Sequence, residues 1–297
     1  METISFIIIS YNRPAETVES IRNVMSEIEK VPGYLFDLIV INNGSTVDYK
    51  EVEEFIQTEQ LQLNYINSPE NLGVSRGRNL GIKNAKGKYV VFIDDDAIFK
   101  TLDAPKTIVD KFEQYPDTGI IAFGIHNYYT GIEDHPVKDK VLLQQQEFYN
   151  NLFWGCGFVV KKEVFDLIGD FDASFFYGME EYDLAYRTID AGYKILFTKN
   201  VIVLHKVSPK GRETNIVKFS RQFVNKTIIA YRFLPYRFVV SHFIMWSAYF
   251  IVKSRCNLFK WVTSCYELFS RMVKEKRTPI SKDSLAYLKK VNARLTF

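Results

Sequence analysis

Short apolar runs alternate with segments of helical spacing over the first hundred residues, and this alternation restricts the fold more than any other feature. The runs are rich in β-branched and aromatic residues, as strands covered on both faces are. After the first run, Pro14 opens a stretch whose apolar residues recur at helical intervals. Alternating strands and helices form right-handed βαβ units around a mostly parallel sheet. We therefore predict an α/β fold with a Rossmann-like sheet and strands at 4–9, 36–41, 61–66 and 89–93.

Polar residues follow three of these predicted strands. They are Ser10, Tyr11, Asn12 and Arg13 after the first strand, Asn42 and Asn43 after the second, and Asp94, Asp95 and Asp96 after the fourth. Because ligands of open α/β sheets bind at the carboxyl ends of the strands, we expect these residues to converge on one crevice. Arg78, which follows the third strand, adds a cation beside it. The sequence contains neither the G-x-G-x-x-G fingerprint nor a P-loop to account for such a crevice.

Three consecutive aspartates at the end of an apolar strand are unfavourable, because adjacent carboxylates repel and each resists the loss of water. A divalent cation relieves both problems. Hard oxygen ligands suit Mg²⁺ or Mn²⁺, with phosphate oxygens and water completing the coordination. The alternative is a solvated acidic turn, which is the commoner fate of acidic clusters. The position of this cluster, after a buried type of strand at the expected ligand edge, favours the cation.

Taken in order, the motifs resemble those of the family 2 inverting glycosyltransferases, which bind a nucleotide sugar with a GT-A fold. The matching pieces are YNRP, NNGS with Asp48 close behind, NLG with RGRN, FIDDD, and GCGFVVKKEVFDLIGDFDASFFYGMEEYDLAYRTIDAGYKI. The resemblance covers about the first 205 residues. It implies that the loop 10–12 and the Asn42-Asn43 turn hold the nucleotide base, and that Arg78 lies near the base and the phosphates.

The resemblance also implies roles for the acidic cluster and for residues beyond the sheet. Asp94, Asp95 and Asp96 would be the D-x-D element, with Asp96 and Asp94 on Mn²⁺ or Mg²⁺ and with Asp94 and Asp95 near the ribose. His205 would join the metal or the diphosphate, although a lone histidine after a strand is more often a structural residue. Lys210 lies in a basic loop that we expect to be a phosphate-binding lid, and the alternative is a solvated loop.

Inverting glycosyl transfer needs one base to take the proton of the acceptor hydroxyl while the nucleoside diphosphate leaves. In MEEYDL, Glu181 stands where the family resembled has its catalytic aspartate, so we predict Glu181 as the base, with Glu180 and Asp183 in reserve. A structural interpretation stands beside this one. Acidic residues at the start of a helix are favoured by its dipole, and Asp183 and Arg187 form an i,i+4 pair.

Two further predictions concern specificity. Gly155 would let the backbone approach a sugar, and Trp154 or Tyr177 would stack on its apolar face, so we predict these residues to bind the acceptor, although either aromatic could equally be core. The family resembled usually has a carboxylate where this chain has Asn42-Asn43. An amide oxygen still accepts the N3–H of uracil or thymine, which favours UDP- and dTDP-sugars over guanine nucleotides.

The carboxyl-terminal third of the chain differs in charge from the rest. Residues 199–297 hold 20 Lys and Arg against 4 Asp and Glu, whereas residues 1–198 hold 18 against 31. We predict a catalytic domain at 1–210 and a basic, aromatic-rich helical region at 211–297. The apolar run 238–252 is shorter than the roughly 20 residues that span a bilayer, which favours a helix or hairpin on an anionic membrane surface. The alternatives are packing on the catalytic domain or on a second subunit, as in a homo-oligomer.

The cysteines, the amino terminus and the absence of nucleic-acid motifs bear on the cellular compartment and the binding partners. Three cysteines without metal or disulfide spacing fit a reducing compartment, and the apolar amino terminus lacks the pattern of a signal peptide. No nucleic-acid motif accompanies the basic region, so we do not expect nucleic-acid binding. The predicted function is a metal-dependent inverting glycosyltransferase at the cytoplasmic membrane face. It would transfer the sugar of a UDP-sugar or a dTDP-sugar to a hydroxyl of a lipid-linked glycan in surface polysaccharide synthesis.

Two rival functions remain open at the level of sequence. A nucleotidyltransferase also uses an α/β sheet, a metal and cations, but usually shows a glycine-rich basic loop after its first strand, where this chain has YNRPAET. A non-catalytic subunit that binds nucleotide sugars is the second rival. Replacement of Glu181 by Gln distinguishes it from an enzyme, because an enzyme would keep donor binding and lose turnover.

Overall fold

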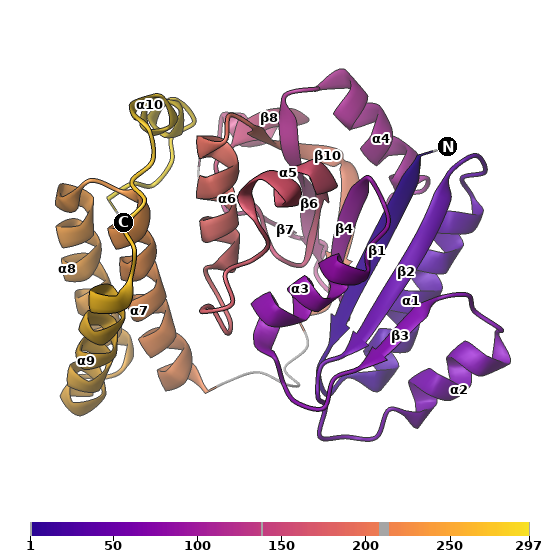
Figure 1. Ribbon diagram of the computed structural model, residues 1–297, viewed down its shortest axis with the longest axis horizontal. Helices are drawn as coiled ribbons and strands as arrows, with labels where there is room; N and C mark the ends of the chain where they lie inside the picture. Colours follow the sequence, from indigo (N-terminus) through magenta and orange to yellow (C-terminus); the bar gives the residue numbers. More distant parts are fainter. Residues whose placement is uncertain (1, 138, 208–213, 297) are drawn as a thin grey trace.

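A single sheet of mixed direction forms the centre of the computed structural model, which describes residues 2–137, 139–207 and 214–296 (Figure 1). The strand order is β3-β2-β1-β4-β9-β6-β10-β5, with β7 beside β6 and β8 beside β10. The strands are β1 (Thr3–Ser10), β2 (Leu35–Asn42), β3 (Asn64–Asn67), β4 (Tyr89–Asp94), β5 (Ala97–Phe99), β6 (Thr118–Asn127), β7 (Glu133–Asp134), β8 (Glu147–Asn150), β9 (Gly157–Lys161) and β10 (Lys194–His205).

Helices pack on both faces of this sheet. The helical elements, including those of the carboxyl-terminal layer described below, are α1 (Pro14–Glu29), α2 (Lys50–Thr58), α3 (Gly73–Asn84), α4 (Ala104–Gln114), the 3₁₀ turn η1 (Leu142–Gln144), α5 (Lys162–Ile168), α6 (Glu180–Asp190), α7 (Asn215–Phe233), α8 (Tyr236–Lys253), α9 (Leu258–Lys274) and α10 (Lys282–Lys290). One apolar core joins α1, α2 and α4 to the sheet, and a second joins α3, α5 and α6 to its other face. The predicted α/β fold class is confirmed.

The amino-terminal half follows the predicted βαβ pattern closely. β1 pairs in parallel with both β2 and β4, and β2 pairs in parallel with β3. The third strand is shorter than expected, because the amide of Leu61 still donates to the carbonyl of Ile56 and closes the end of α2. Beyond β4 the sheet changes direction. β9 runs antiparallel between β4 and β6, which the alternation of strands and helices did not predict.

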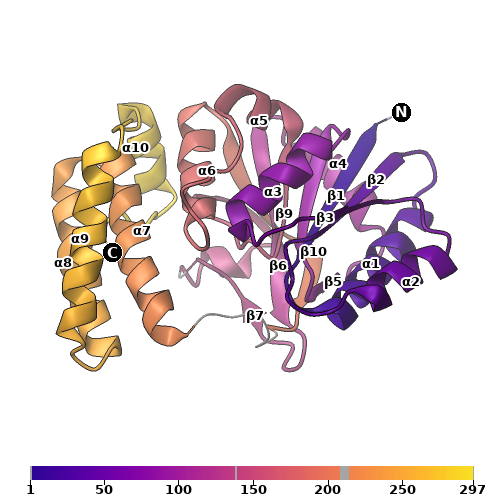
Figure 2. The same cartoon turned by 60° about the horizontal axis from the view of Figure 1, so that its bottom comes forward.

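The carboxyl-terminal helices form a layer beside the sheet domain (Figures 1 and 2). α7 lies between α6 and the pair α8 and α9. The core on the α6 side of the sheet continues into this layer through Phe223, Ile228, Phe250 and Leu268. The predicted run 238–252 lies in α8, and none of the helices described here is long and apolar enough to cross a membrane. Residue 210, the predicted domain boundary, lies outside the described residues, so the division into 1–210 and 211–297 stays a prediction.

Candidate functional site

The register of the parallel strands brings the predicted polar residues to one edge of the sheet. Ser10 at the end of β1 is paired with Asn42 at the end of β2, and Ile9 is paired with Asp94 at the end of β4. The three strands therefore end side by side. The crevice expected from the sequence is the place where these ends meet.

The acidic cluster meets a histidine at this edge. After Asp94 the chain turns back into β5, which pairs antiparallel with β10 and places Ala97 opposite His205. Nε2 of His205 lies 3.2 Å from Oδ1 of Asp96. One ligand atom from each of Asp94, Asp96 and His205 lies within 4.8 Å of the others. Two carboxylates and an imidazole that converge in this way fit Mn²⁺ or Mg²⁺.

Arg13 ties the first loop to the acidic cluster. Its Nη1 lies 2.7 Å from Oδ1 of Asp95 and 3.4 Å from Oδ2 of Asp96. The backbone amide of Tyr11 also donates to Asp95, at 3.3 Å. Burial raises the pKa of Asp95 to about 7, against the opposing effect of Arg13. Asp95 therefore holds the loop after β1 in place. Asp94 and Asp96, on either side of it, converge with His205.

Two of the predicted base-binding residues are buried scaffolding. Oγ of Ser10 lies 2.6 Å from Oγ1 of Thr17 and 2.5 Å from the hydroxyl of Tyr49. Nδ2 of Asn43 donates to the carbonyl of Gly73 at 3.2 Å. Both side chains are buried. Both side chains hold the loops of the crevice in place, and their direct contact with a nucleotide base stays a prediction.

Asn12 and Asn42 join the first two loops at the surface. Asn12 adopts a positive φ of 61°, and its Oδ1 accepts the amide of Thr46 at 2.8 Å. Oδ1 of Asn42 accepts the amide of Ser45 at 3.1 Å, while its Nδ2 donates to Asn67 at 3.0 Å. An amide oxygen keeps a second lone pair after such a bond. Asn42 can therefore still accept one hydrogen bond from a ligand.

A cavity of about 350 Å³ opens beside the acidic cluster. It is lined by Val74, Arg78, Asp94, Asp134, Leu152, Phe153, Trp154, Gly155, Cys156, Tyr177, Gly178, Met179, Glu180, Glu181, Tyr182, His205, Val207, Lys218, Arg221, Gln222 and Asn225. The structure thus brings the predicted Trp154, Gly155 and Tyr177 together with Glu181 and His205. The sequence analysis missed the α7 residues of this lining, which recur as a polar stripe at helical spacing.

Arg78 holds the two glutamates at the start of α6. Its Nη1 lies 3.3 Å from Oε1 of Glu180 and 3.6 Å from Oε1 of Glu181, and its Nη2 donates to the carbonyl of Gly155 at 2.8 Å. The Glu180 side chain is 2% exposed, and burial together with the neighbouring Glu181 charge raises its pKa. The Glu181 side chain is 18% exposed and faces the cavity. Of the two, Glu181 is better placed to reach a substrate.

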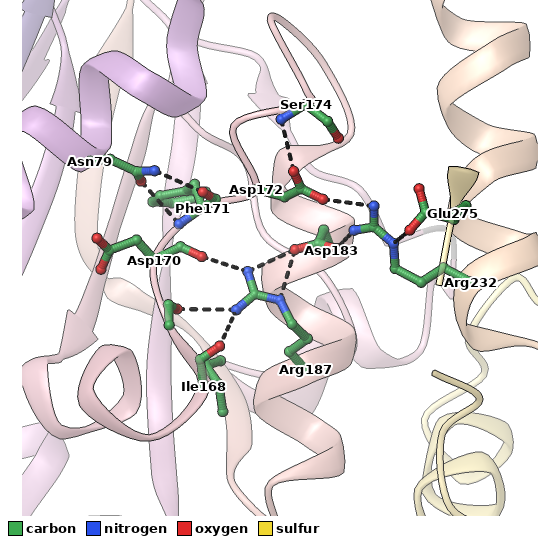
Figure 3. Close-up of polar contacts among 11 residues, drawn as sticks. Asn79, Ile168, Asp170, Phe171, Asp172, Ser174, Asp183, Arg187, Arg232 and Glu275 are labelled. Atoms are coloured by element: carbon green, nitrogen blue, oxygen red, sulfur yellow. Dashed lines mark hydrogen bonds and ion pairs between the residues drawn. The ribbon is translucent and has the colours of Figure 1, made fainter. Parts of the chain in front are cut away.

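Asp183 lies elsewhere, in a buried ion network that joins α6 to α7 (Figure 3). Its carboxylate pairs with Arg187, at 2.7 Å, and with Arg232 of α7. Arg232 also pairs with Asp172 at 2.6 Å and with Glu275 at 2.7 Å. The Asp183 side chain is fully buried and does not line the cavity. The role of reserve base stays a prediction for Asp183, and in this structure its carboxylate fastens the helical layer to the sheet domain.

The predicted basic lid falls partly outside the described residues. Lys210 is among the residues that the structure does not describe. Lys206, which precedes it, pairs with Glu19 of α1, and its Nζ lies 5.0 Å from the ring centre of Tyr128. The amide of Lys206 donates to the carbonyl of Asp96 at 2.9 Å. The segment after β10 therefore starts against the acidic cluster.

Comparison with known proteins decides the family. The sequence profile described as glycosyl transferase family 2 matches residues 5–169. The chain belongs to glycosyl transferase family 2. AglE, a glycosyltransferase of Haloferax volcanii, is 24% identical over 210 residues, which are 70% of this chain and 68% of AglE. The poly-β-1,6-N-acetyl-D-glucosamine synthase of Staphylococcus aureus strain COL is 30% identical over 122 residues, 41% of this chain and 28% of the synthase.

Another relative shows how much shorter the shared segment can be. An uncharacterized glycosyltransferase of Rickettsia bellii is 38% identical over 96 residues, which are 32% of this chain and 13% of that protein. The curated relatives of this kind therefore extend well beyond the part they share with this chain. The family profile accounts for the order of the motifs between residues 5 and 169.

Solved structures resemble the whole chain. Mannosyltransferase PcManGT from Pyrobaculum calidifontis, in complex with GDP-Man and Mn²⁺, has a TM-score of 0.60 at 18% identity and covers 97% of this chain and 78% of its own. GalNAc-T7 with UDP, GalNAc and Mn²⁺ has a TM-score of 0.67 at 15% sequence identity. The match covers 99% of this chain and 58% of GalNAc-T7. S. aureus TarS 1-349 with UDP-GlcNAc has a TM-score of 0.61 at 13% sequence identity. The match covers 88% of this chain and 79% of the TarS chain. At these identities the likeness shows the fold, which is GT-A.

Proposed function

We propose that this glycosyltransferase is metal-dependent and inverting, and that it transfers a sugar from a UDP- or dTDP-sugar to a hydroxyl of a lipid-linked glycan. The observation that carries the proposal is the joint placement of Asp94, Asp96, His205 and Glu181. The first three converge within 4.8 Å, and Asp94, His205 and Glu181 line the same cavity. A leaving-group site and a base site therefore adjoin. Such an arrangement suits glycosyl transfer to a hydroxyl.

On the donor side, the chain's own residues would orient the nucleotide sugar. Asp94, Asp96 and His205 would hold Mn²⁺ or Mg²⁺, which when bound stabilises the negative charge that develops on a leaving diphosphate. Arg78, whose Nη2 lies 4.0 Å from Oδ1 of Asp94, adds a fixed positive charge to the same place. The loops of Asn12 and Asn42 would receive the pyrimidine. Solved neighbours that contain UDP or GDP-Man with Mn²⁺ support a metal-bound nucleotide donor, and the choice of a pyrimidine rests on Asn12 and Asn42.

On the acceptor side, Glu181 would act as the general base. Its carboxylate takes the proton of the acceptor hydroxyl as the oxygen forms its bond to C1 of the sugar. The bond from C1 to the diphosphate oxygen breaks on the opposite side, and the nucleoside diphosphate leaves with that electron pair. The Arg78 guanidinium lies 3.6 Å from the Glu181 carboxylate and 3.3 Å from that of Glu180, so it holds both side chains in position. A base of this kind adds about 10² to 10⁴ in rate.

The outer face of the helical layer supports a membrane-bound acceptor. On α9 the exposed apolar side chains recur at helical spacing, and α8 exposes a second apolar row beside them. They are Phe259, Val262, Tyr266, Phe269 and Val273 on α9, and Val240, Ile244 and Val252 on α8. Lys253, Arg255 and Lys260 surround the turn between the two helices. A charged fringe beside an exposed apolar face is typical of helices that lie in the surface of an anionic bilayer.

We propose on this basis that the protein lies on an anionic membrane surface, and we keep the prediction that this is the inner face of the cell membrane. Co-sedimentation with vesicles tests the assignment. Binding to vesicles that contain phosphatidylglycerol, with little binding to pure phosphatidylcholine and loss on replacing Phe259 and Phe269 by Ser, is the expected result. A concentration-dependent dimer that forms through the same residues, without vesicle binding, would instead identify the face as an interface between two copies.

A donor screen tests the proposed reaction. Nucleotide sugars that bind only the folded protein raise its melting temperature, so UDP- and dTDP-sugars should do so with Mn²⁺ and much less after its removal. Glu181→Gln then separates an enzyme from a non-catalytic binding subunit. The variant should keep the donor-induced rise in melting temperature and lose turnover. Unchanged turnover would remove Glu181 from the base role, and stabilisation by GDP-sugars alone would refute the pyrimidine assignment.

A further inference from the structure

The cavity has a second charged wall, which comes from the helical layer and not from the sheet. Lys218, Arg221, Gln222 and Asn225 stand at i, i+3, i+4 and i+7 of α7 and all line the cavity. Phe223 and Val224, which turn away from this stripe, are buried in the core. α7 therefore presents one polar stripe to the cavity, and the two charged residues in that stripe are cations.

The polar stripe of α7 is held in position by contacts on both sides. Nδ2 of Asn225 donates to the carbonyl of Gly178 at 2.9 Å, and its Oδ1 accepts from Arg271 of α9 at 2.8 Å. The guanidinium carbon of Arg221 lies 5.3 Å from the ring centre of Phe176. Lys218 is exposed and forms no ion pair within the part of the chain that the structure describes. A fixed guanidinium and an available ammonium thus face the same space.

The base lies on a segment that is contacted both from the sheet side and from the α7 side of the cavity. The segment 177–182 lies between the two sides of the cavity. Arg78, from the sheet side, contacts Glu180 and Glu181. Asn225, from the α7 side, contacts Gly178 of the same segment. In an inverting displacement the acceptor approaches C1 from the side opposite the leaving group, so we assign the α7 side of the cavity to the acceptor.

The same end of the helical layer carries the basic turn between α8 and α9. The rings of Phe219 and Tyr249 lie 6.0 Å apart, and the hydroxyls of Ser220 and Ser264 are 2.6 Å apart. The start of α7 therefore packs against the end of α8 and the first half of α9. An acceptor that reaches Glu181 from a membrane bound at this turn passes the cations of α7 on the way.

We infer that Lys218 and Arg221 form a subsite for a phosphate ester of the acceptor, on the side of Glu181 away from the metal cluster. The inference rests on the proposed function and deepens it, since it identifies the acceptor as anionic at the point where it enters the cavity. Guanidinium and ammonium groups bind phosphate oxygens through charge-assisted hydrogen bonds, and a guanidinium can bind two oxygens at once. The phosphate could belong to a lipid carrier or to a soluble sugar phosphate.

Titration calorimetry tests this subsite with the donor site already filled. The protein is first saturated with Mn²⁺ and with the nucleoside diphosphate that stabilises it best, so that this site cannot take up the probe. The probes are farnesyl phosphate, farnesol, N-acetylglucosamine 1-phosphate and inorganic phosphate. Farnesyl phosphate should bind and farnesol should not, and Lys218→Gln or Arg221→Gln should each weaken binding of the phosphate probe about tenfold. Lys218→Arg should restore most of it.

The remaining probes show whether the phosphate belongs to a lipid carrier or to a soluble sugar phosphate, and a control variant tests the specificity of the effect. Tighter binding of N-acetylglucosamine 1-phosphate than of farnesyl phosphate identifies a soluble acceptor, and the reverse identifies a lipid carrier. Lys289→Gln, an exposed lysine of α10 outside the cavity, should change nothing. The inference is overturned if no organic phosphate binds better than inorganic phosphate, or if Lys218→Gln and Arg221→Gln weaken nucleotide binding and leave the probes unaffected. The proposed function fails separately, if no nucleoside diphosphate stabilises the protein at all.

Discussion

Gly155 is the position at which one added methyl group most directly tests the proposed base. A Cβ built at Gly155 would lie 2.2 Å from Oε1 of Glu181 and 2.6 Å from Nη2 of Arg78. Both atoms are ends of flexible side chains, so Gly155→Ala forces them to move by roughly 1 Å to reach ordinary contact distances. A displacement of about 1 Å at a reacting group costs on the order of 10²-fold in rate. We therefore expect kcat to fall about 100-fold.

The same geometry predicts that folding is little affected. Gly155 does not have a positive φ, so alanine introduces no backbone strain there. Melting temperature, followed by circular dichroism, should change by less than about 3 °C, while initial rates are measured with the donor found in the screen. Gly124→Ala is the matched control, because a Cβ at Gly124 meets no heavy atom closer than 3.6 Å. Full activity of Gly155→Ala would refute the placement of Glu181 and Arg78 at the reaction centre.

Three further substitutions test the charges around the site. Arg78→Met leaves buried Glu180 without its counter-charge and should cost about 3 kcal/mol in urea unfolding; no loss would contradict the pairing. Asp183→Asn should cost a similar amount, because Arg232 loses a buried partner, yet the folded variant should keep its turnover, and a large loss of kcat would return Asp183 to the site. Burial lowers the pKa of Lys226 to about 7 from 10.5, so the unfolded chain binds more protons between these values and stability rises with pH. Lys226→Met should stabilise the protein more at pH 7 than at pH 10 in the same assay, and equal effects at both would contradict this pKa.

The sheet edge could be predicted because it depends on local patterns. Apolar runs fixed the positions of β1, β2 and β4, and parallel strands end together, so Ser10, Asn42 and Asp94 had to be neighbours. The same reasoning could not show that Ser10 is buried. Its hydroxyl is used by Tyr49, 39 residues away, and such a partner leaves no trace in the local sequence.

The acceptor side could be predicted less well because it is built from distant segments. Asp183 and Glu181 look alike in the motif MEEYDL, and only the arrival of Arg232 from α7 separates a structural carboxylate from one that faces the cavity. In the sequence, the cations of α7 are part of the basic region 211–297 and carry no further signal. Their role in the cavity depends on how α7 packs beside α6, which is a tertiary contact and not a property of the stripe itself.

Anomalous diffraction from crystals grown with Mn²⁺ and UDP tests the central claim most directly. The claim is that Asp94, Asp96 and His205 hold the cation that carries the donor diphosphate, next to Glu181. It predicts one manganese peak about 2 Å from carboxylate oxygens of both aspartates and from Nε2 of His205, with the diphosphate oxygens on its open side. Bound UDP with manganese at another place, or with no manganese at these three residues, would contradict it.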